Sequence, residues 1–198
     1  MKLQKYQKCS EVTRGLEKAE LVLKNARIVN VFTREILKGD IAIEDGLISG
    51  IGSYEGKREI DLEGRYVCPG LIDSHLHLES TLVTPAELVT VAARHGTTTF
   101  IVDPHESANV SGLKGIDYIL DQTEDVDANV FVMMPSCVPA TAIDDNGCTL
   151  TAQDMEPYLS KKRILGLGEV MDYISVVKGD EAMHRKLELF SDKVRDGH

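Results

Sequence analysis

The chain has 198 residues, of which 42% are hydrophobic, and its 32 acidic and 22 basic residues give a formal net charge of −10. This composition is sufficient for a buried core and excludes a disordered chain, and the length fits one domain or one and a fraction. The longest basic run is residues 161–163. Nucleic acid and anionic membrane surfaces are therefore excluded as predicted partners.

The four cysteines, at positions 9, 68, 137 and 148, show no C-x-x-C spacing, and no charged start followed by an apolar signal core opens the chain. We therefore expect reduced thiols in a cytoplasmic protein. No apolar run approaches the ~20 residues needed to cross a bilayer, so the sequence predicts a soluble protein with no membrane partner.

Residues 1–20 are polar, with Val12, Leu16 and Ala19 at helical spacing. They predict a short amphipathic helix as an N-terminal extension. Residues 21–68 predict a small β-domain of sandwich-like character, with strands at 21–23, 27–31 and 40–44 and a hairpin turn at 44–48.

Residues 69–198 alternate between apolar strands and helical segments, which predicts an α/β fold with βαβ units and a parallel sheet. The expected strands are 70–77, 98–103, 129–134 and 164–169, and the expected helices lie near 85–95, 111–122, 151–160 and 180–191. Polar residues end these strands at steps of roughly thirty residues, which matches an eight-unit (β/α) barrel of about 250 residues. A doubly wound sheet would alternate in the same way, but a leading histidine pair and later carboxylates at the strand ends favour the first half of a barrel.

His75 and His77 come at the end of the apolar run that Pro69 and Gly70 open. Side chains alternate along a strand, so both imidazoles point to one face, with Asp73 behind them. Two imidazoles on one face suit a transition metal that activates water for hydrolysis. The alternative is a chance pair of surface histidines.

Carboxylates and a further histidine end the later strands. Glu169 follows the glycine-containing strand 164–169, where a carboxylate could bridge two metal ions or could simply be solvated. Asp103, His105 and Glu106 place three ionisable groups within four residues, and such a cluster at an apolar strand end favours a site over a turn Asp and a surface His. His105 is predicted either to bind the metal or to contact one of its ligands.

Three other residues with possible chemistry are predicted to be structural. His95 precedes Gly96 at a predicted helix end, and His184 lies in a charged helical stretch. Cys137 could line a pocket, but a buried inert thiol is the more common case.

From about residue 20 to its end, the chain resembles the adenine deaminase family of the amidohydrolase superfamily. Five motifs carry this resemblance; the first marks the superfamily and the other four indicate the adenine deaminase branch. The motifs are Val67–Ser80, Asp103–Glu106, Pro135–Thr141, Gly168–Met171 and Asp196–His198.

The resemblance implies a binuclear centre of divalent transition metals in a distorted barrel, with manganese or iron expected and zinc as the alternative. By motif, His75 and His77 would hold the first metal and His198 would be the ligand from the next strand. Glu169 would bridge the ions where many relatives use a carbamylated lysine.

The implied reaction is hydrolytic deamination of adenine to hypoxanthine and ammonia in purine salvage. Glu169, Asp103, His105 and Glu106 are the catalytic candidates, and the sequence does not choose among the last three for protonation of the leaving amine. The alternatives are an amidohydrolase acting on a cyclic amide or an imidazolone, and an inactive half-barrel that serves as an assembly module.

Members of the resembled family continue for several hundred residues with further ligands. We therefore expect the chain to be an N-terminal piece, whether a truncated product, a cleavage fragment or half of a split gene. An open barrel has an unpaired edge and an apolar face. The expected chain is inactive alone, and it forms a homo-oligomer or docks with the missing C-terminal half.

Overall fold

The computed structural model describes residues 3–141 and 143–198. The chain divides into two compact units, Met1–Pro69 and Gly70–His198. Within the described ranges, no helix has both the length and the hydropathy that a membrane span needs.

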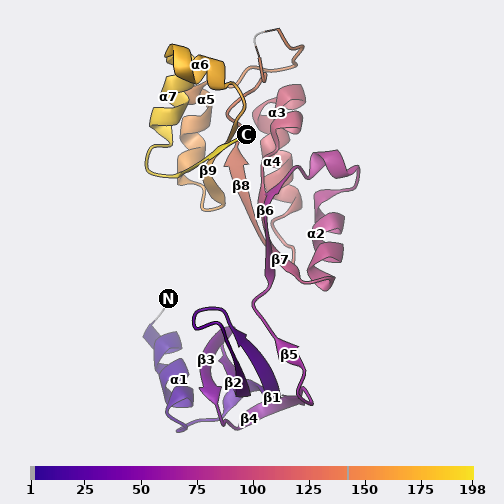
Figure 1. Cartoon of the computed structure of the whole chain (residues 1–198), viewed down its shortest axis with the longest axis vertical. Helices are drawn as coiled ribbons and strands as arrows, with labels where there is room; N and C mark the ends of the chain where they lie inside the picture. Colours follow the sequence, from indigo (N-terminus) through magenta and orange to yellow (C-terminus); the bar gives the residue numbers. More distant parts are fainter. Residues whose placement is uncertain (1–2, 142) are drawn as a thin grey trace. The chain divides into compact units, whose positions relative to one another are not determined.

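The first unit is a single mixed sheet with one helix, rather than two packed sheets, over the residues that are described (Figure 1). Its strand order is β3-β2-β1-β4, and β5 also pairs with β1; the β1–β2 and β2–β3 pairs are antiparallel, and β4 and β5 run parallel to β1. The elements are α1 (Leu3–Thr13), β1 (Ala19–Asn30), β2 (Glu35–Glu44), β3 (Leu47–Gly52), β4 (Gly56–Asp61) and β5 (Tyr66–Val67).

Helix α1 is an integral part of this unit and not a separate extension, because Val12 is buried against Ala19, Val22 and Ala42 of the sheet. The predicted hairpin turn is confirmed, since Glu44 pairs with Leu47 across a two-residue loop.

The two strands predicted at 21–23 and 27–31 are wrong as separate elements, because β1 runs through both. A register shift between Leu23 and Ala26 interrupts the alternation of apolar side chains. Asn25 lies inside this bulge and has a φ of 55°. The two regular parts of β1 on either side of the bulge therefore appear in the sequence as two short apolar runs.

The second unit contains the predicted parallel sheet, whose strand order is β10-β9-β8-β7-β6. The order follows the sequence without reversal, as in a barrel, whereas a doubly wound sheet reverses at a switch point. The sheet is therefore part of a barrel. The strands are β6 (Leu71–Leu76), β7 (Thr97–Val102), β8 (Asn129–Met134), β9 (Ile164–Val170) and β10 (Val194–Gly197).

Helices cover the sheet and form the core with it. Phe100, Val102 and Val132 of the strands are buried in one cluster with Ile116 and Phe190 from the helical segments. The helices are α2 (Pro85–Arg94), α3 (His105–Ser111), α4 (Leu113–Gln122), α5 (Ala152–Met155), α6 (Tyr173–Lys178) and α7 (Glu181–Leu189), with 3₁₀ turns η1 (Glu79–Thr81) and η2 (Glu156–Ser160).

The predicted helices differ from the observed ones at particular residues. The helix expected near 111–122 is α4 alone, because Gly112 with a φ of 62° separates it from α3, which was not predicted. The helix expected at 151–160 becomes 3₁₀ after Met155, where Pro157 has no N–H for an α-helical bond. Helix α6 was also not predicted.

Candidate metal centre

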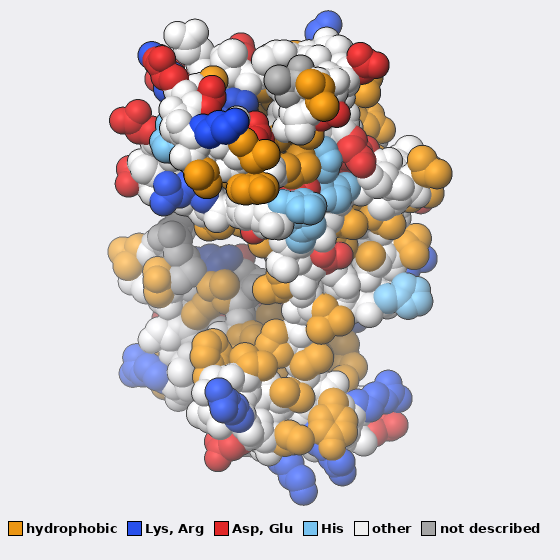
Figure 2. All heavy atoms as spheres, turned by 45° about the horizontal axis from the view of Figure 1, so that its top comes forward, with side chains coloured by type: hydrophobic (Ala, Val, Ile, Leu, Met, Phe, Trp, Pro, Cys, Tyr) orange, Lys and Arg blue, Asp and Glu red, His pale blue; other side chains and the backbone are white. Residues whose placement is uncertain are grey.

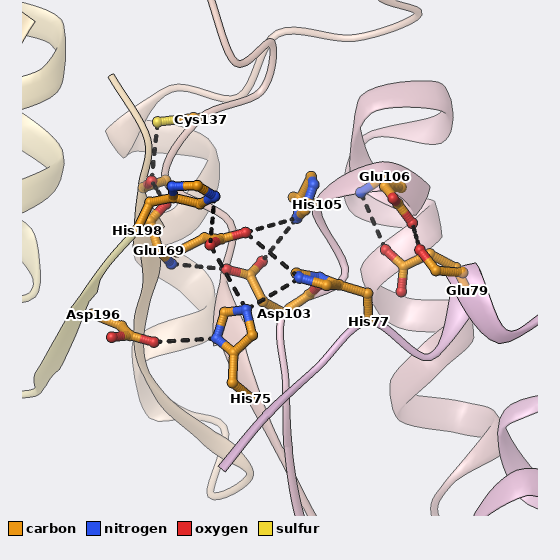
Figure 3. Close-up of polar contacts among 12 residues, drawn as sticks. His75, His77, Glu79, Asp103, His105, Glu106, Cys137, Glu169, Asp196 and His198 are labelled. Atoms are coloured by element: carbon orange, nitrogen blue, oxygen red, sulfur yellow. Dashed lines mark hydrogen bonds and ion pairs between the residues drawn. The ribbon is translucent and has the colours of Figure 1, made fainter. Parts of the chain in front are cut away.

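The carboxyl ends of the parallel strands bring four histidines and two buried carboxylates together (Figure 3). Parallel strands end at one edge of a sheet, so residues far apart in the sequence meet there. The contributing residues are His75 on β6, His77 just after it, Asp103 after β7, His105 at the start of α3, Glu169 on β9 and His198 after β10.

His75 and His77 face each other with their Nε2 atoms 3.1 Å apart. The Nδ1 of His77 lies 2.7 Å from the carbonyl oxygen of Asp103, and the Nδ1 of His75 lies 3.3 Å from Asp196 Oδ2. These acceptors favour a proton on each Nδ1, which leaves a lone pair on each Nε2. Two lone pairs pointing into one gap fit a shared cation.

The Glu169 carboxylate, which is 6% exposed, lies at the centre of the histidines. Its Oε1 is 3.6 Å from both His77 Nε2 and His105 Nδ1. Its Oε2 is 3.7 Å from His75 Nε2 and 3.9 Å from His198 Nε2. These separations exceed hydrogen-bond lengths but suit atoms that share an ion, since metal–ligand bonds are about 2.1 Å long.

Asp103 contacts the backbone of Glu169 directly. Its Oδ2 accepts a hydrogen bond from the Glu169 N–H at 2.8 Å, whereas its buried Oδ1 has no partner among the described residues. A side chain at Gly168 would collide with this carboxylate, so glycine is required there for the close approach. Burial raises the pKa of Asp103 to about 7; the hydrogen bond from Glu169 opposes that shift and the Glu169 carboxylate adds to it.

The His105 ring closes the site from helix α3. Burial, and next the His77 imidazole, lowers the pKa of His105, so its neutral form is favoured. Its Nδ1 is buried, has no hydrogen-bond partner in the part of the chain that the structure describes, and lies 3.9 Å from Asp103 Oδ1. His105 thus offers an unused lone pair to the cluster.

Glu106, the remaining predicted catalytic candidate, lies outside the cluster (Figure 3). Its exposed carboxylate accepts a hydrogen bond from Ser80 Oγ. Glu79, for which no role was predicted, accepts hydrogen bonds from the backbone N–H groups of Glu106 and Ser107 at 3.1 and 3.2 Å. It therefore fixes the first turn of α3, which carries His105.

Asp196 and Lys186 were also missed. Asp196 orients His75, as described above. The buried Lys186 ammonium donates a hydrogen bond to the Ser136 carbonyl at 2.7 Å, and the Ser136 hydroxyl donates one to the Glu169 carbonyl at 2.6 Å. No sequence signal pairs these residues, because the contacts join separate elements of the fold.

Of the three residues predicted to be structural, the two histidines lie away from the cluster, whereas Cys137 lies beside it, with its Sγ 3.1 Å from the Ser136 hydroxyl (Figure 3). His95 is exposed at the end of α2, and His184 is exposed with its Nε2 2.9 Å from the Val176 carbonyl. Cys137 is 4% exposed, and it also lines a separate cavity of about 880 Å³.

A cavity of about 580 Å³ adjoins the cluster. Figure 2 shows histidine side chains gathered on the viewed face beside hydrophobic ones. The cavity therefore combines an apolar wall with polar groups at one end. Its lining includes Ile101, Met133, Leu165 and Val194 together with His75, Glu169, Asp196 and His198.

The sequence model of the amidohydrolase family matches residues 66–194, which span the parallel sheet and the cluster. The chain belongs to the amidohydrolase family. Adenine deaminases are similar to this amidohydrolase over most of its length. That of Desulfitobacterium hafniense (strain Y51) is 60% identical over 184 residues, covering 93% of this chain and 32% of that protein. That of Geobacillus kaustophilus (strain HTA426) is 51% identical over 183 residues, covering 91% and 32% respectively.

This amidohydrolase thus spans about a third of the length of the curated relatives it matches. Among solved structures, N-isopropylammelide isopropylaminohydrolase from Burkholderia multivorans aligns with a TM-score of 0.59 at 16% identity, covering 87% of this chain and 50% of that one. This likeness supports the fold, in agreement with the sequential strand order.

Proposed function

We propose that this amidohydrolase supplies the metal-binding part of an adenine deaminase, which hydrolyses adenine to hypoxanthine and ammonia. The observation that carries the proposal is the His75–His77 pair, with both Nε2 atoms aimed at Glu169. The similarity to adenine deaminases at up to 60% identity supports the choice of substrate.

His75, His77 and Glu169 would hold one divalent ion, and their donor atoms lie within 4.8 Å of one another. A divalent ion bound there supplies a water of lowered pKa as the nucleophile for C–N hydrolysis. Glu169 and His198 would take part in holding a second divalent ion, and manganese or iron is proposed ahead of zinc.

The remaining roles follow from position. Asp103 and His105 lie in the cluster and can move a proton to the leaving amine, whereas the carboxylate of Glu106 lies outside it. The apolar wall of the cavity, which includes Ile101 and Met133, suits the faces of a planar base.

A chimeric enzyme tests the substrate directly. The matched segment of the Desulfitobacterium hafniense adenine deaminase would be replaced by this chain, and ammonia release from adenine would be measured. We expect activity with adenine and none with dihydroorotate or hydantoin, and we expect His75→Gln to abolish it. Turnover of a cyclic amide without turnover of adenine would refute the proposal.

Location and assembly are part of the same proposal. The four cysteines form no disulfide within the described residues, which supports a reducing compartment, and we place the protein in the cytoplasm. The 198-residue chain alone should have negligible activity and should associate, either with its own copies or with a complementary C-terminal half.

A further inference from the structure

We propose that Asp103 and His105 form a further cation position with Glu169, on the opposite side of its carboxylate from His198. It rests on the proposed function only in assuming that the cluster binds divalent metal. It would give Asp103 and His105 a metal-binding role in place of proton transfer.

The first support is a pair of buried atoms without partners. Asp103 is 1% exposed, and over residues 3–141 and 143–198 its Oδ1 has no hydrogen bond although its Oδ2 has one. Over the same ranges His105 Nδ1 is likewise buried and unpartnered. Buried polar atoms are almost always satisfied, so two orphans at one place call for an explanation.

The second support is their separation. His105 Nδ1 lies 3.9 Å from Asp103 Oδ1 and 3.6 Å from Glu169 Oε1, so neither contact is a hydrogen bond. Two ligand atoms that each lie about 2.1 Å from one ion are roughly 3 to 4 Å apart. One ligand atom from each of the three residues lies within 4.8 Å of the other two, so together they border a space that a divalent ion can occupy.

The third support is charge. Asp103 and Glu169 bring two carboxylates into one buried place, and over the described ranges neither forms an ion pair with a lysine or arginine. Buried carboxylates without a cation are costly. A divalent ion between them removes this cost.

The position differs from one built on His198 because the two sets use different oxygens of Glu169. His105 faces Oε1 at 3.6 Å, whereas His198 faces Oε2 at 3.9 Å. Removing His105 should therefore release an ion that removal of His198 leaves bound.

The test counts ions bound to the 198-residue chain. Metal-free protein is dialysed to equilibrium against Mn²⁺, and bound manganese per chain is measured by atomic emission. We expect His105→Gln to bind one ion fewer than wild type. His198→Gln should retain that ion, and His75→Gln should lose a different one, so that the double variant His75→Gln/His105→Gln loses both. His95→Gln, at an exposed histidine outside the cluster, is the matched control.

Asp103→Asn is the second variant, because an amide oxygen can still accept the Glu169 N–H. Circular dichroism of the metal-free variants checks that each folds. The manganese count of a variant that folds, His105→Gln or Asp103→Asn, then decides the question. An unchanged manganese count in the folded variant would overturn the inference, as would a single ion lost equally from His75→Gln and His105→Gln. The count is independent of turnover, so inactivity of the chimera towards adenine refutes the proposed function alone.

Discussion

Removing the Asp196 carboxylate should weaken metal binding without touching a metal-binding atom. Asp196 Oδ2 lies 3.3 Å from His75 Nδ1, and this contact holds the ring with Nε2 towards Glu169. Partners of this kind are worth 10- to 100-fold in metal affinity. The two side chains are 40% and 41% exposed, so water competes for the contact and the lower end of that range applies.

We therefore expect Asp196→Ala to raise the Kd for Mn²⁺ about tenfold, equivalent to about 1.4 kcal/mol. Asp196→Asn should fall in between, because its amide oxygen still accepts from Nδ1 while its charge is lost. The assay is competition with a chromophoric chelator at fixed pH. Asp192→Ala is the control, since Asp192 is an exposed aspartate of the same segment.

Two results would refute the reasoning. An unchanged Kd in Asp196→Ala would show that the ring needs no orientation from this carboxylate. A complete loss of the ion would instead make Asp196 a direct ligand.

Three further predictions concern the rest of the chain. Burial alone would raise the pKa of Asp40, but hydrogen bonds from the Lys24 ammonium and from the N–H groups of Asn25 and Tyr54 outweigh it and hold that pKa below its ordinary value. Asp40→Asn should thus lower the free energy of unfolding by about 2 kcal/mol at neutral pH. The difference from wild type should shrink as the pH falls below about 4, because the wild-type side chain then becomes protonated and neutral as well. A difference that urea unfolding shows to be independent of pH would contradict this prediction. Lys186→Met should leave the free energy of unfolding within about 2 kcal/mol of wild type, since replacing a buried charge is often tolerated. It should still raise the Kd for Mn²⁺ several-fold, because Lys186 contacts the site through Ser136. An unchanged Kd, measured by chelator competition, would show that Lys186 does not influence the site. Ile72, 64% exposed on the edge strand β6, should drive self-association, so Ile72→Lys should shift the sedimentation coefficient to that of a monomer, and a wild-type chain that already sediments as a monomer would disprove this.

The sequence predicted the parallel sheet because each strand is an apolar run ended by a polar residue, and this pattern depends on local burial alone. The continuous strand β1 could not be read, since the bulge at Asn25 removes the alternation on which strand prediction depends. The break at Gly112 was missed for a related reason, because a single glycine in a helical pattern is often tolerated.

For the candidate site, strand ends indicated where His77, Asp103 and Glu169 would meet, but not how the side chains point. A helix begins at His105, and that start turns its ring into the cluster while directing Glu106 away from it. The supporting contacts of Lys186 and Asp196 could not be predicted, because each joins elements whose proximity is a product of the whole fold.

The sequential strand order has a consequence for folding. Because β6, β7, β9 and β10 or the residues that directly follow them supply the cluster, the full ligand set exists only after these strands have joined the sheet. An ion that binds the native chain and not the unfolded one shifts the folding equilibrium by mass action, by about 2.7 kcal/mol at a hundred times its Kd. Metal supply would then set the proteolytic lifetime of residues 70–198. Residues 1–69 form a separate compact unit and supply none of these ligands.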